Sequence, residues 1–139
     1  MGVDIDVVYE GDLHCQAIHR PSKNQLVTDA PVDNGGKGAA FSPTDLVATA
    51  LGSCMVTIMG KVAQRSNLPL EGTRIHLVKD MAADPVRRIG CLSVTISIPK
   101  GSQLSAKDRA KLEAAAATCP VKQSLHPDVK IVTTFVYEE

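Results

Sequence analysis

The sequence is poor in aromatic side chains, with two Phe, two Tyr and no Trp among 139 residues. Because 44% of its residues are nonetheless hydrophobic, we expect a core built from Ala, Val, Leu, Ile and Met. Neither sign of charge is in excess, since 15 Lys and Arg balance 15 Asp and Glu. This balance argues against a broad binding surface for nucleic acid or for an anionic membrane.

Zinc-site spacing is also missing, because the four cysteines form no Cys-x-x-Cys pair and the four histidines are scattered. We therefore expect no metal site. The chain does not open on a basic and then apolar leader, which predicts a cytoplasmic protein. Structural disulfides are not expected in the cytosol, so a reversible catalytic pair is the more interesting use of the cysteines. The cysteines are Cys15, Cys54, Cys91 and Cys119.

The main apolar stretch predicts a long helix over residues 42–64. Ser42 is a suitable N-cap, Pro43 fits the first helical position, and Asp45 completes a Ser-x-x-Asp capping box. The apolar residues that follow recur at helical spacing. They are Val47, Ala50, Leu51, Cys54, Ile58 and Val62.

This helix is polar only at every fourth position between Asp45 and Lys61. A helix that is apolar around most of its girth is normally surrounded by protein or by lipid. Lipid is not expected, since the run between these two charges is shorter than the roughly 20 residues that cross a bilayer. The sequence therefore predicts a buried central helix that carries Cys54 near its middle.

Alternating patterns elsewhere predict strands, and a second Ser-x-x-Asp box predicts a helix over residues 105–117. A glycine-rich loop is expected over residues 31–40, and a short helix after Cys119. The order of these elements indicates one α+β domain over residues 1–139 with a mostly antiparallel sheet. A single sheet covers one side of the central helix, so a second copy of the chain is expected on the other. The predicted strands are residues 3–9, 13–18, 25–29, 74–79, 92–98 and 129–137.

The segment that begins at Cys119 has the features of another helix start. Pro120 at the first helical position places Cys119 at the N-cap, beside free backbone N–H groups and the positive end of the helix dipole. Both favour the thiolate, and Lys122 adds positive charge one turn further on. For Cys54, by contrast, an inert buried thiol remains an open alternative.

The first of two motifs is Ser42-Pro43-Thr44-Asp45-Leu46 continuing to Ala50-Leu51-Gly52-Ser53-Cys54, and the second is the later Cys119-Pro120-Val121. Together these motifs resemble the OsmC/Ohr family of thiol peroxidases. The Ala-Leu-Gly-Ser-Cys motif is similar to that of the OsmC-like branch. The resemblance covers the whole chain as a single OsmC-like domain. It implies an intertwined homodimer with active sites at the subunit interface, which reduces organic hydroperoxides without a cofactor. Cys54 is then the peroxidatic thiolate, and Cys119 is the resolving thiol. A dithiol reductant of the lipoyl or thioredoxin type restores both.

The resemblance also implies an arginine from the N-terminal strands beside the reactive thiol, held by a glutamate near the start of the central helix. Arg20, at a strand end, is the candidate arginine. Thr44 stands at the usual glutamate position, so Asp45 is the candidate to replace it. The alternatives are a solvated turn residue for Arg20 and a pure capping role for Asp45.

Two rival functions remain open from the sequence. The protein is either a non-catalytic or redox-sensing binder of a small apolar ligand at a dimer interface, or a dimerising structural protein with inert thiols. The absence of the family's glutamate favours the binder.

Overall fold

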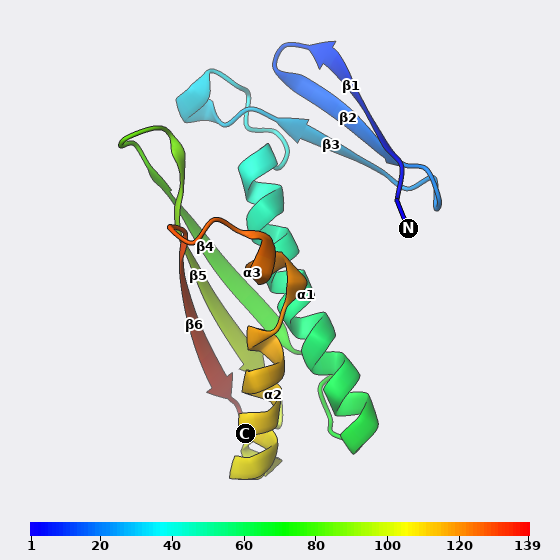
Figure 1. Cartoon of the computed structure of the whole chain (residues 1–139), viewed down its shortest axis with the longest axis vertical. Coiled ribbons are helices and arrows are strands. Elements are labelled where there is room, and N and C mark those ends of the chain that lie inside the picture. Colours follow the sequence, from blue (N-terminus) through cyan, green and yellow to red (C-terminus); the bar gives the residue numbers. More distant parts are fainter. The chain divides into compact units, whose positions relative to one another are not determined.

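The computed structural model describes residues 1–139, which form two compact units, Met1–Val47 and Ala48–Glu139. Each unit has a three-stranded sheet of its own (Figure 1). The α+β class is confirmed, but the expectation of one sheet is wrong. The first three predicted strands pair only with one another, so the strands that follow the long helix make a second sheet.

The N-terminal unit is an antiparallel meander of β1 (Ile5–Gly11), β2 (His14–His19) and β3 (Gln25–Asp29) in that spatial order. All three predicted strands are confirmed to within two residues. The β1–β2 turn runs through positive φ angles of 54° at Asp12 and 59° at Leu13, as expected for a tight hairpin. Strand β1 is exposed along nearly its whole length, so the prediction that it is half-buried is wrong for one chain.

A compact loop leads from β3 to the long helix and contains the short 3-10 helix η1 (Val32–Asn34). Gly36 allows a close approach here, since a Cβ at this position would lie 1.8 Å from the carbonyl oxygen of Ala30. The backbone N–H of Gly38 donates to the same oxygen at 3.3 Å. The predicted loop is thus present, and its glycines pack against Ala30, the residue that precedes it.

The long helix α1 (Pro43–Ser66) begins as predicted. Ser42 Oγ accepts the backbone N–H of Asp45 at 3.1 Å, and Asp45 Oδ2 accepts the backbone N–H of Ser42 at 2.9 Å. Two N–H groups at the helix start are therefore satisfied reciprocally, which is the defining geometry of a capping box.

Within the C-terminal unit, α1 buries one face, on which Leu51, Met55 and Met59 are at most 1% exposed. Gly52 lets the helix approach the sheet, because a Cβ there would lie 2.6 Å from Leu77 Cδ1. The predicted buried helix is thus confirmed on this face, and the opposite side is the one on which the sequence predicts a second copy of the chain. Its stripe of small and polar residues is exposed at Thr49, Ser53, Thr57 and Lys61. The helix is long and apolar enough to cross a membrane, but a packed core helix passes the same test.

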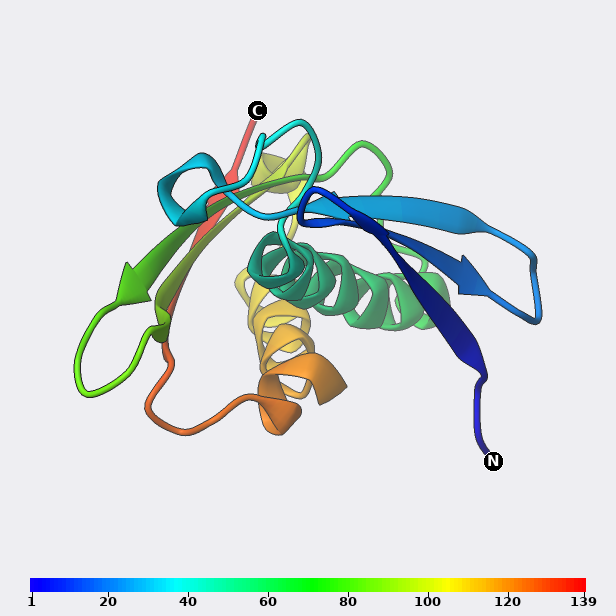
Figure 2. The same cartoon turned by 90° about the horizontal axis from the view of Figure 1, so that it is seen from above.

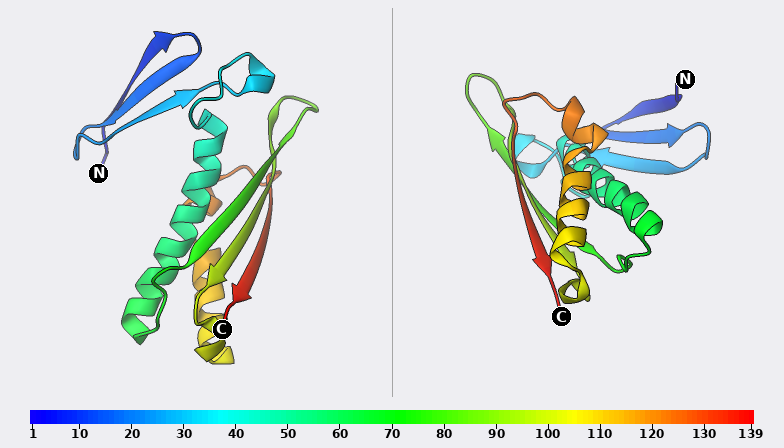
Figure 3. Two further views of the ribbon diagram at one scale, coloured as in Figure 1. Left: turned by 180° about the vertical axis from the view of Figure 1, so that it is seen from behind. Right: turned by 60° about the horizontal axis from the view of Figure 1, so that its bottom comes forward.

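The C-terminal sheet pairs β4 (Arg74–Ala82) antiparallel with β5 (Arg88–Ile98), and β5 parallel with β6 (Lys130–Tyr137). The parallel pair arises because the chain between β5 and β6 is a long crossover. It contains η2 (Gly101–Gln103), α2 (Ala106–Ala117) and α3 (Pro120–Ser124). Helices α1 and α2 lie on the same face of this sheet (Figures 2 and 3).

The core of this unit lies between that face and the helices. The clearest predicted strand supplies alternate side chains to it, and each of them is at most 1% exposed. These side chains are Leu92, Val94, Ile96 and Ile98. Cys119 lies in the same core, at the junction of α2 and α3.

Candidate functional site: two thiols in the core of the C-terminal unit

The structure brings Cys54 and Cys119 together from distant parts of the sequence. Cys54 comes from the middle of α1 and is half-buried, while Cys119 precedes α3 and has no exposed surface. The two side chains are near neighbours, since Cys54 acts together with burial to raise the pKa of Cys119. Both are free thiols, so the structure represents the reduced form of the pair.

Cys119 is the N-cap of α3, as predicted, and its sulfur accepts the backbone N–H of Lys122 at 3.5 Å. The expectation that this position favours the thiolate is nevertheless wrong. Burial is the largest influence and raises the pKa of Cys119, and the hydrogen bond with Cys54 acts in the same direction. The N–H groups of Lys122 and Val121 lower the pKa, but burial outweighs them. The cap was visible in the sequence, whereas the burial was not.

The state of Cys119 has a chemical consequence for its neighbour. A buried, protonated Cys119 can donate its S–H to the sulfur of Cys54. Cys54 is the more accessible of the two and therefore the one that meets a dissolved reactant first. The pair thus combines an approachable thiol with a shielded one.

A cavity of about 180 Å³ lies in the same unit. Its walls come from α1, α2, α3 and β6, all within the C-terminal unit. The wall residues are Met55, Glu113, Ala116, Ala117, Lys122 and Phe135 with Thr133. Met55 follows Cys54 directly in α1, and Lys122 donates its N–H to Cys119 Sγ, but neither cysteine is itself part of the wall.

Arg20 lies at the end of β2 in the N-terminal unit, where it forms an ion pair. Its Nε donates to Asp6 Oδ2 at 2.6 Å and its Nη2 donates to Asp6 Oδ1 at 3.0 Å. The hydrogen bond with Arg20 lowers the pKa of the Asp6 carboxyl. Arg20 is therefore more than an unpaired turn residue, and its side chain is still 60% exposed. Its role beside Cys54 stays a prediction.

Asp45 performs the capping role described above. Its carboxylate faces the start of α1, and Thr44 Oγ1 lies 3.3 Å from the hydroxyl of the N-cap Ser42. The cap accounts for one of its carboxylate oxygens. A catalytic role for Asp45 stays a prediction.

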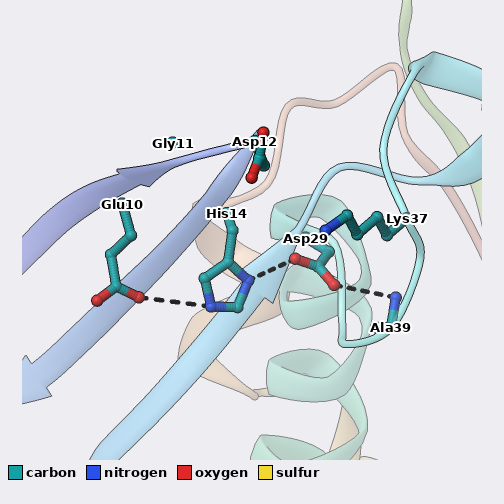
Figure 4. A pocket seen from close by; sticks show the side chains of 7 residues that line it. All are labelled: Glu10, Gly11, Asp12, His14, Asp29, Lys37 and Ala39. Carbon is teal, nitrogen blue, oxygen red and sulfur yellow. Dashed lines mark hydrogen bonds and ion pairs between the residues drawn. The ribbon is translucent and has the colours of Figure 1, made fainter.

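A second cavity, of about 350 Å³, lies in the N-terminal unit (Figure 4). His14 Nδ1 bonds to Asp29 Oδ1 at 2.5 Å, and the other Asp29 oxygen accepts the backbone N–H of Ala39 at 3.0 Å. The second ring nitrogen of His14 lies 3.5 Å from Glu10 Oε1. The hydrogen bond with His14 is the main reason that the pKa of Asp29 is lowered.

Sequence reasoning missed this pair, because it sought His and Asp at motif spacing. The signal was in the strand register, where His14 lies directly opposite Asp29 on β2 and β3. Asp29 also ties β3 to the loop before α1, so the pair has a structural role. No group of three or more His, Cys, Asp or Glu side chains is placed to hold a metal ion.

The remaining cysteines are both half-buried strand residues. Cys15 faces Thr28 across the β2–β3 ladder, and Cys91 Sγ lies 3.8 Å from the hydroxyl of Ser93. Both are free thiols in the structure.

Comparison with known proteins gives consistent matches. A sequence profile described as OsmC-like protein matches residues 35–134. A crystallised protein of Psychrobacter arcticus 273-4, described in terms of osmotic stress and detoxification response, is 45% identical with a TM-score of 0.88. That match covers 94% of this chain and 93% of the other. No curated protein matches the chain.

More distant structures share the fold alone. The organic hydroperoxide resistance protein OsmC of Legionella pneumophila is 17% identical, with a TM-score of 0.77 over 98% of this chain and 97% of that one. The organic hydroperoxide resistance protein OhrB of Bacillus subtilis is 14% identical, with a TM-score of 0.67 over 97% and 98%.

Proposed function

The chain belongs to the OsmC-like family, and from this premise we propose that it is a thiol-dependent peroxidase. Its substrates are organic hydroperoxides, with hydrogen peroxide reduced less well. The observation that carries the proposal is the proximity of Cys54 and Cys119 in the core of the C-terminal unit. Two distant relatives by fold are named for organic hydroperoxide resistance, which supports the same reaction.

In the first step, the Cys54 thiolate attacks the distal oxygen of the hydroperoxide. The O–O bond breaks, the alkoxide takes up a proton and leaves as an alcohol, and Cys54 becomes a sulfenic acid. The half-buried position of Cys54 suits this role, because a substrate reaches it more readily than it reaches the fully buried Cys119.

In the second step, Cys119 condenses with the sulfenic acid. Its sulfur forms the Cys54–Cys119 disulfide, and the sulfenic hydroxyl leaves as water with the thiol proton. The proximity of the two side chains in the core supports this step. A dithiol of the lipoyl or thioredoxin type then restores both thiols through a mixed disulfide.

Arg20 supplies the positive charge beside the Cys54 thiolate in this proposal, and Asp45 holds the guanidinium in place. Arg20 is engaged by Asp6 in the reduced chain, so it must exchange this carboxylate for the thiolate. Because the Arg20–Asp6 pair is exposed, and exposed ion pairs contribute little to stability, such an exchange is inexpensive.

The active unit is a cytoplasmic homodimer in this proposal. The N-terminal segment has a row of large apolar side chains that are each more than 50% exposed in one chain. A second copy that covers them removes apolar surface from water, which is the usual driving force for association. These side chains are Val3, Ile5, Val7, Val8 and Tyr9.

The proposal is tested by following cumene hydroperoxide consumption with a dithiol reductant. Cys54→Ser is expected to abolish turnover, whereas Cys91→Ser, a matched half-buried thiol, is expected to keep it. One equivalent of peroxide should remove two hydrogens from the wild-type mass, with the link mapped between Cys54 and Cys119. Full activity in Cys54→Ser would refute the assignment.

A second candidate function is a redox-sensing or non-catalytic binder of a small apolar ligand. The observation in its favour is that Arg20 is already paired with Asp6, with Thr44 where the family places a glutamate. A binder would form no Cys54–Cys119 link on peroxide treatment. The mass experiment therefore separates the two functions.

A further inference from the structure

The cavity of about 350 Å³ in the N-terminal unit has no part in the proposed peroxidase reaction. Its walls come from β1, the β1–β2 turn, β2, the end of β3 and the loop before α1, so all of it lies within one unit. Most of its lining side chains are ionisable, and they comprise three carboxylates, one imidazole and one ammonium. These are Glu10, Asp12, Asp29, His14 and Lys37.

His14 is held between two carboxylates in this lining, as Figure 4 shows. Its Nδ1 bonds to Asp29 Oδ1, and the second oxygen of Asp29 accepts the Ala39 N–H. The bond with His14 is the main cause that lowers the pKa of Asp29, so this carboxyl is ionised and can only accept hydrogen bonds. The hydrogen between the two side chains therefore belongs to Nδ1, which leaves a lone pair on Nε2 of the neutral ring.

The lone pair of Nε2 has a second acceptor beside it. Glu10 Oε1 lies 3.5 Å from His14 Nε2, which is longer than an ordinary hydrogen bond of about 2.7–3.2 Å. While His14 is neutral, neither of these two atoms has a hydrogen to donate to the other. A donor with two or more hydrogens that enters from the cavity can bond to both atoms at once.

The charge of the lining indicates that this donor is a cation. Lys37 is close enough to Asp29 for its charge to lower the pKa of that carboxyl, so these two charges offset one another. Glu10 and Asp12 then leave two negative charges at the cavity. A metal ion matches less well, because no three His, Cys, Asp or Glu side chains are placed to hold one. A primary ammonium group has three hydrogens and one positive charge, so it satisfies both acceptors together.

We propose that this cavity binds a small aliphatic diamine. One ammonium group lies between Glu10 and His14 and donates to both, and the other is attracted by the carboxylate of Asp12. A short diamine matches the two remaining negative charges, and a volume of about 350 Å³ accommodates its chain. The site belongs to the N-terminal unit alone and does not involve the thiol pair, so it is a binding function separate from the proposed peroxidase.

Protonation of His14 competes with this ligand. The imidazolium donates from Nε2 towards Glu10, so the proton takes the place of an ammonium hydrogen, and the positive ring repels the ligand. Among the other groups of the cavity, Glu10 and Asp12 attract the ligand while they are ionised, Asp29 keeps the proton on Nδ1, and Lys37 stays positive. Binding should therefore weaken as the solution is acidified and His14 takes up a proton, while the carboxylates are still charged.

The test observes the imidazole directly by nuclear magnetic resonance. The full chain, labelled with ¹⁵N-histidine, is titrated near neutral pH with 1,4-diaminobutane, butylamine and 1,4-butanediol, and the signals are assigned by replacing the histidines in turn. The diamine should shift the Nε2 signal of His14 saturably, and the signals of His19, His76 and His126 should not move. Butylamine should bind about tenfold more weakly, the loss expected for one charge-assisted contact, and the uncharged diol should not bind.

Three variants complete the experiment. Glu10→Gln should weaken the binding of both amines about tenfold, whereas Asp12→Asn should weaken the diamine about tenfold and leave butylamine unchanged. Asp4→Asn removes the same charge just before β1 begins, outside the cavity, and should change neither affinity. A His14 signal that does not respond to the diamine, or equal affinities for wild type and Glu10→Gln, would overturn the inference. Neither result bears on Cys54, so the proposed function is tested separately.

Discussion

His14 lies directly opposite Asp29 in the β2–β3 ladder, and its Nδ1 bonds to Asp29 Oδ1 at 2.5 Å. Asp29 is 4% exposed and also accepts the N–H of Ala39. One carboxylate therefore joins a strand, its neighbour and the loop that leads to α1.

Replacing this carboxylate should destabilise the protein in a pH-dependent way. The pKa of Asp29 is lowered in the folded protein, so its stabilising effect is full above the unfolded value of about 3.8 and is lost as the pH falls through the folded value. Asp29→Asn should lower Tm by several degrees at pH 7, with the difference from wild type narrowing below pH 4. Thermal melts from pH 2 to pH 8 measure this difference. A constant difference over that range would contradict the role of the charge.

Two glycines of α1 should respond oppositely to alanine. A Cβ at Gly52 would lie 2.6 Å from Leu77 Cδ1 and 3.1 Å from Ile75 Cγ2, whereas a Cβ at Gly60 meets nothing within 4 Å. Gly52→Ala should destabilise by about 1–3 kcal/mol through overpacking. Gly60→Ala should stabilise by up to about 1 kcal/mol through helix propensity. Urea unfolding measures both, and a destabilising Gly60→Ala would show that another surface covers this side of the helix.

Asp45 variants separate capping from catalysis. Asp45→Ala should cost about 1 kcal/mol of stability, because the carboxylate that accepts the Ser42 N–H is lost while the bond from the Asp45 backbone N–H to Ser42 Oγ remains. Asp45→Asn retains an acceptor for the Ser42 N–H and should remain close to wild type in stability. If Asp45 also holds Arg20, Asp45→Asn should lower the rate of peroxide reduction at least tenfold. Normal activity in a stable Asp45→Asn variant would show that Asp45 only caps the helix and has no part in catalysis.

Cys119 should be slow to react until the solution is strongly alkaline. Burial raises its pKa above the ordinary value of 9.0, and the sulfur has no exposed surface. Because the folded value is the higher one, this group stabilises the fold below pH 9 and loses that effect as the pH rises through the folded value. Alkylation by iodoacetamide, followed by peptide mass, should label Cys54 before Cys119 at pH 8. Faster labelling of Cys119 would contradict its burial.

Much of the fold was predictable because its signals are local. The capping box of Ser42 and Asp45 lies within four residues. The alternation of apolar and polar residues over 92–98 has the two-residue period of a strand. Both elements form through interactions between residues that are neighbours in the sequence. The N-cap position of Cys119 was predictable for the same reason.

The rest depended on contacts between distant segments. The sequence near Cys119 indicates the helix dipole but not the core that encloses the sulfur, so the direction of its pKa shift was predicted wrongly. The bond between His14 and Asp29 required the strand register. The division into two sheets required knowing that β6 pairs parallel to β5 after a helical crossover.

The place of Cys119 at the far end of the β5–β6 crossover has a consequence for the stability of the oxidised protein. A bond from its sulfur to Cys54 encloses β4, β5 and α2 in one covalent ring. Closing a ring of that length restricts the unfolded chain by roughly 4 kcal/mol in the chain-entropy model. The oxidised protein should therefore melt at a higher temperature than the reduced protein. Its thermal stability would rise when the disulfide forms and fall again when the disulfide is reduced.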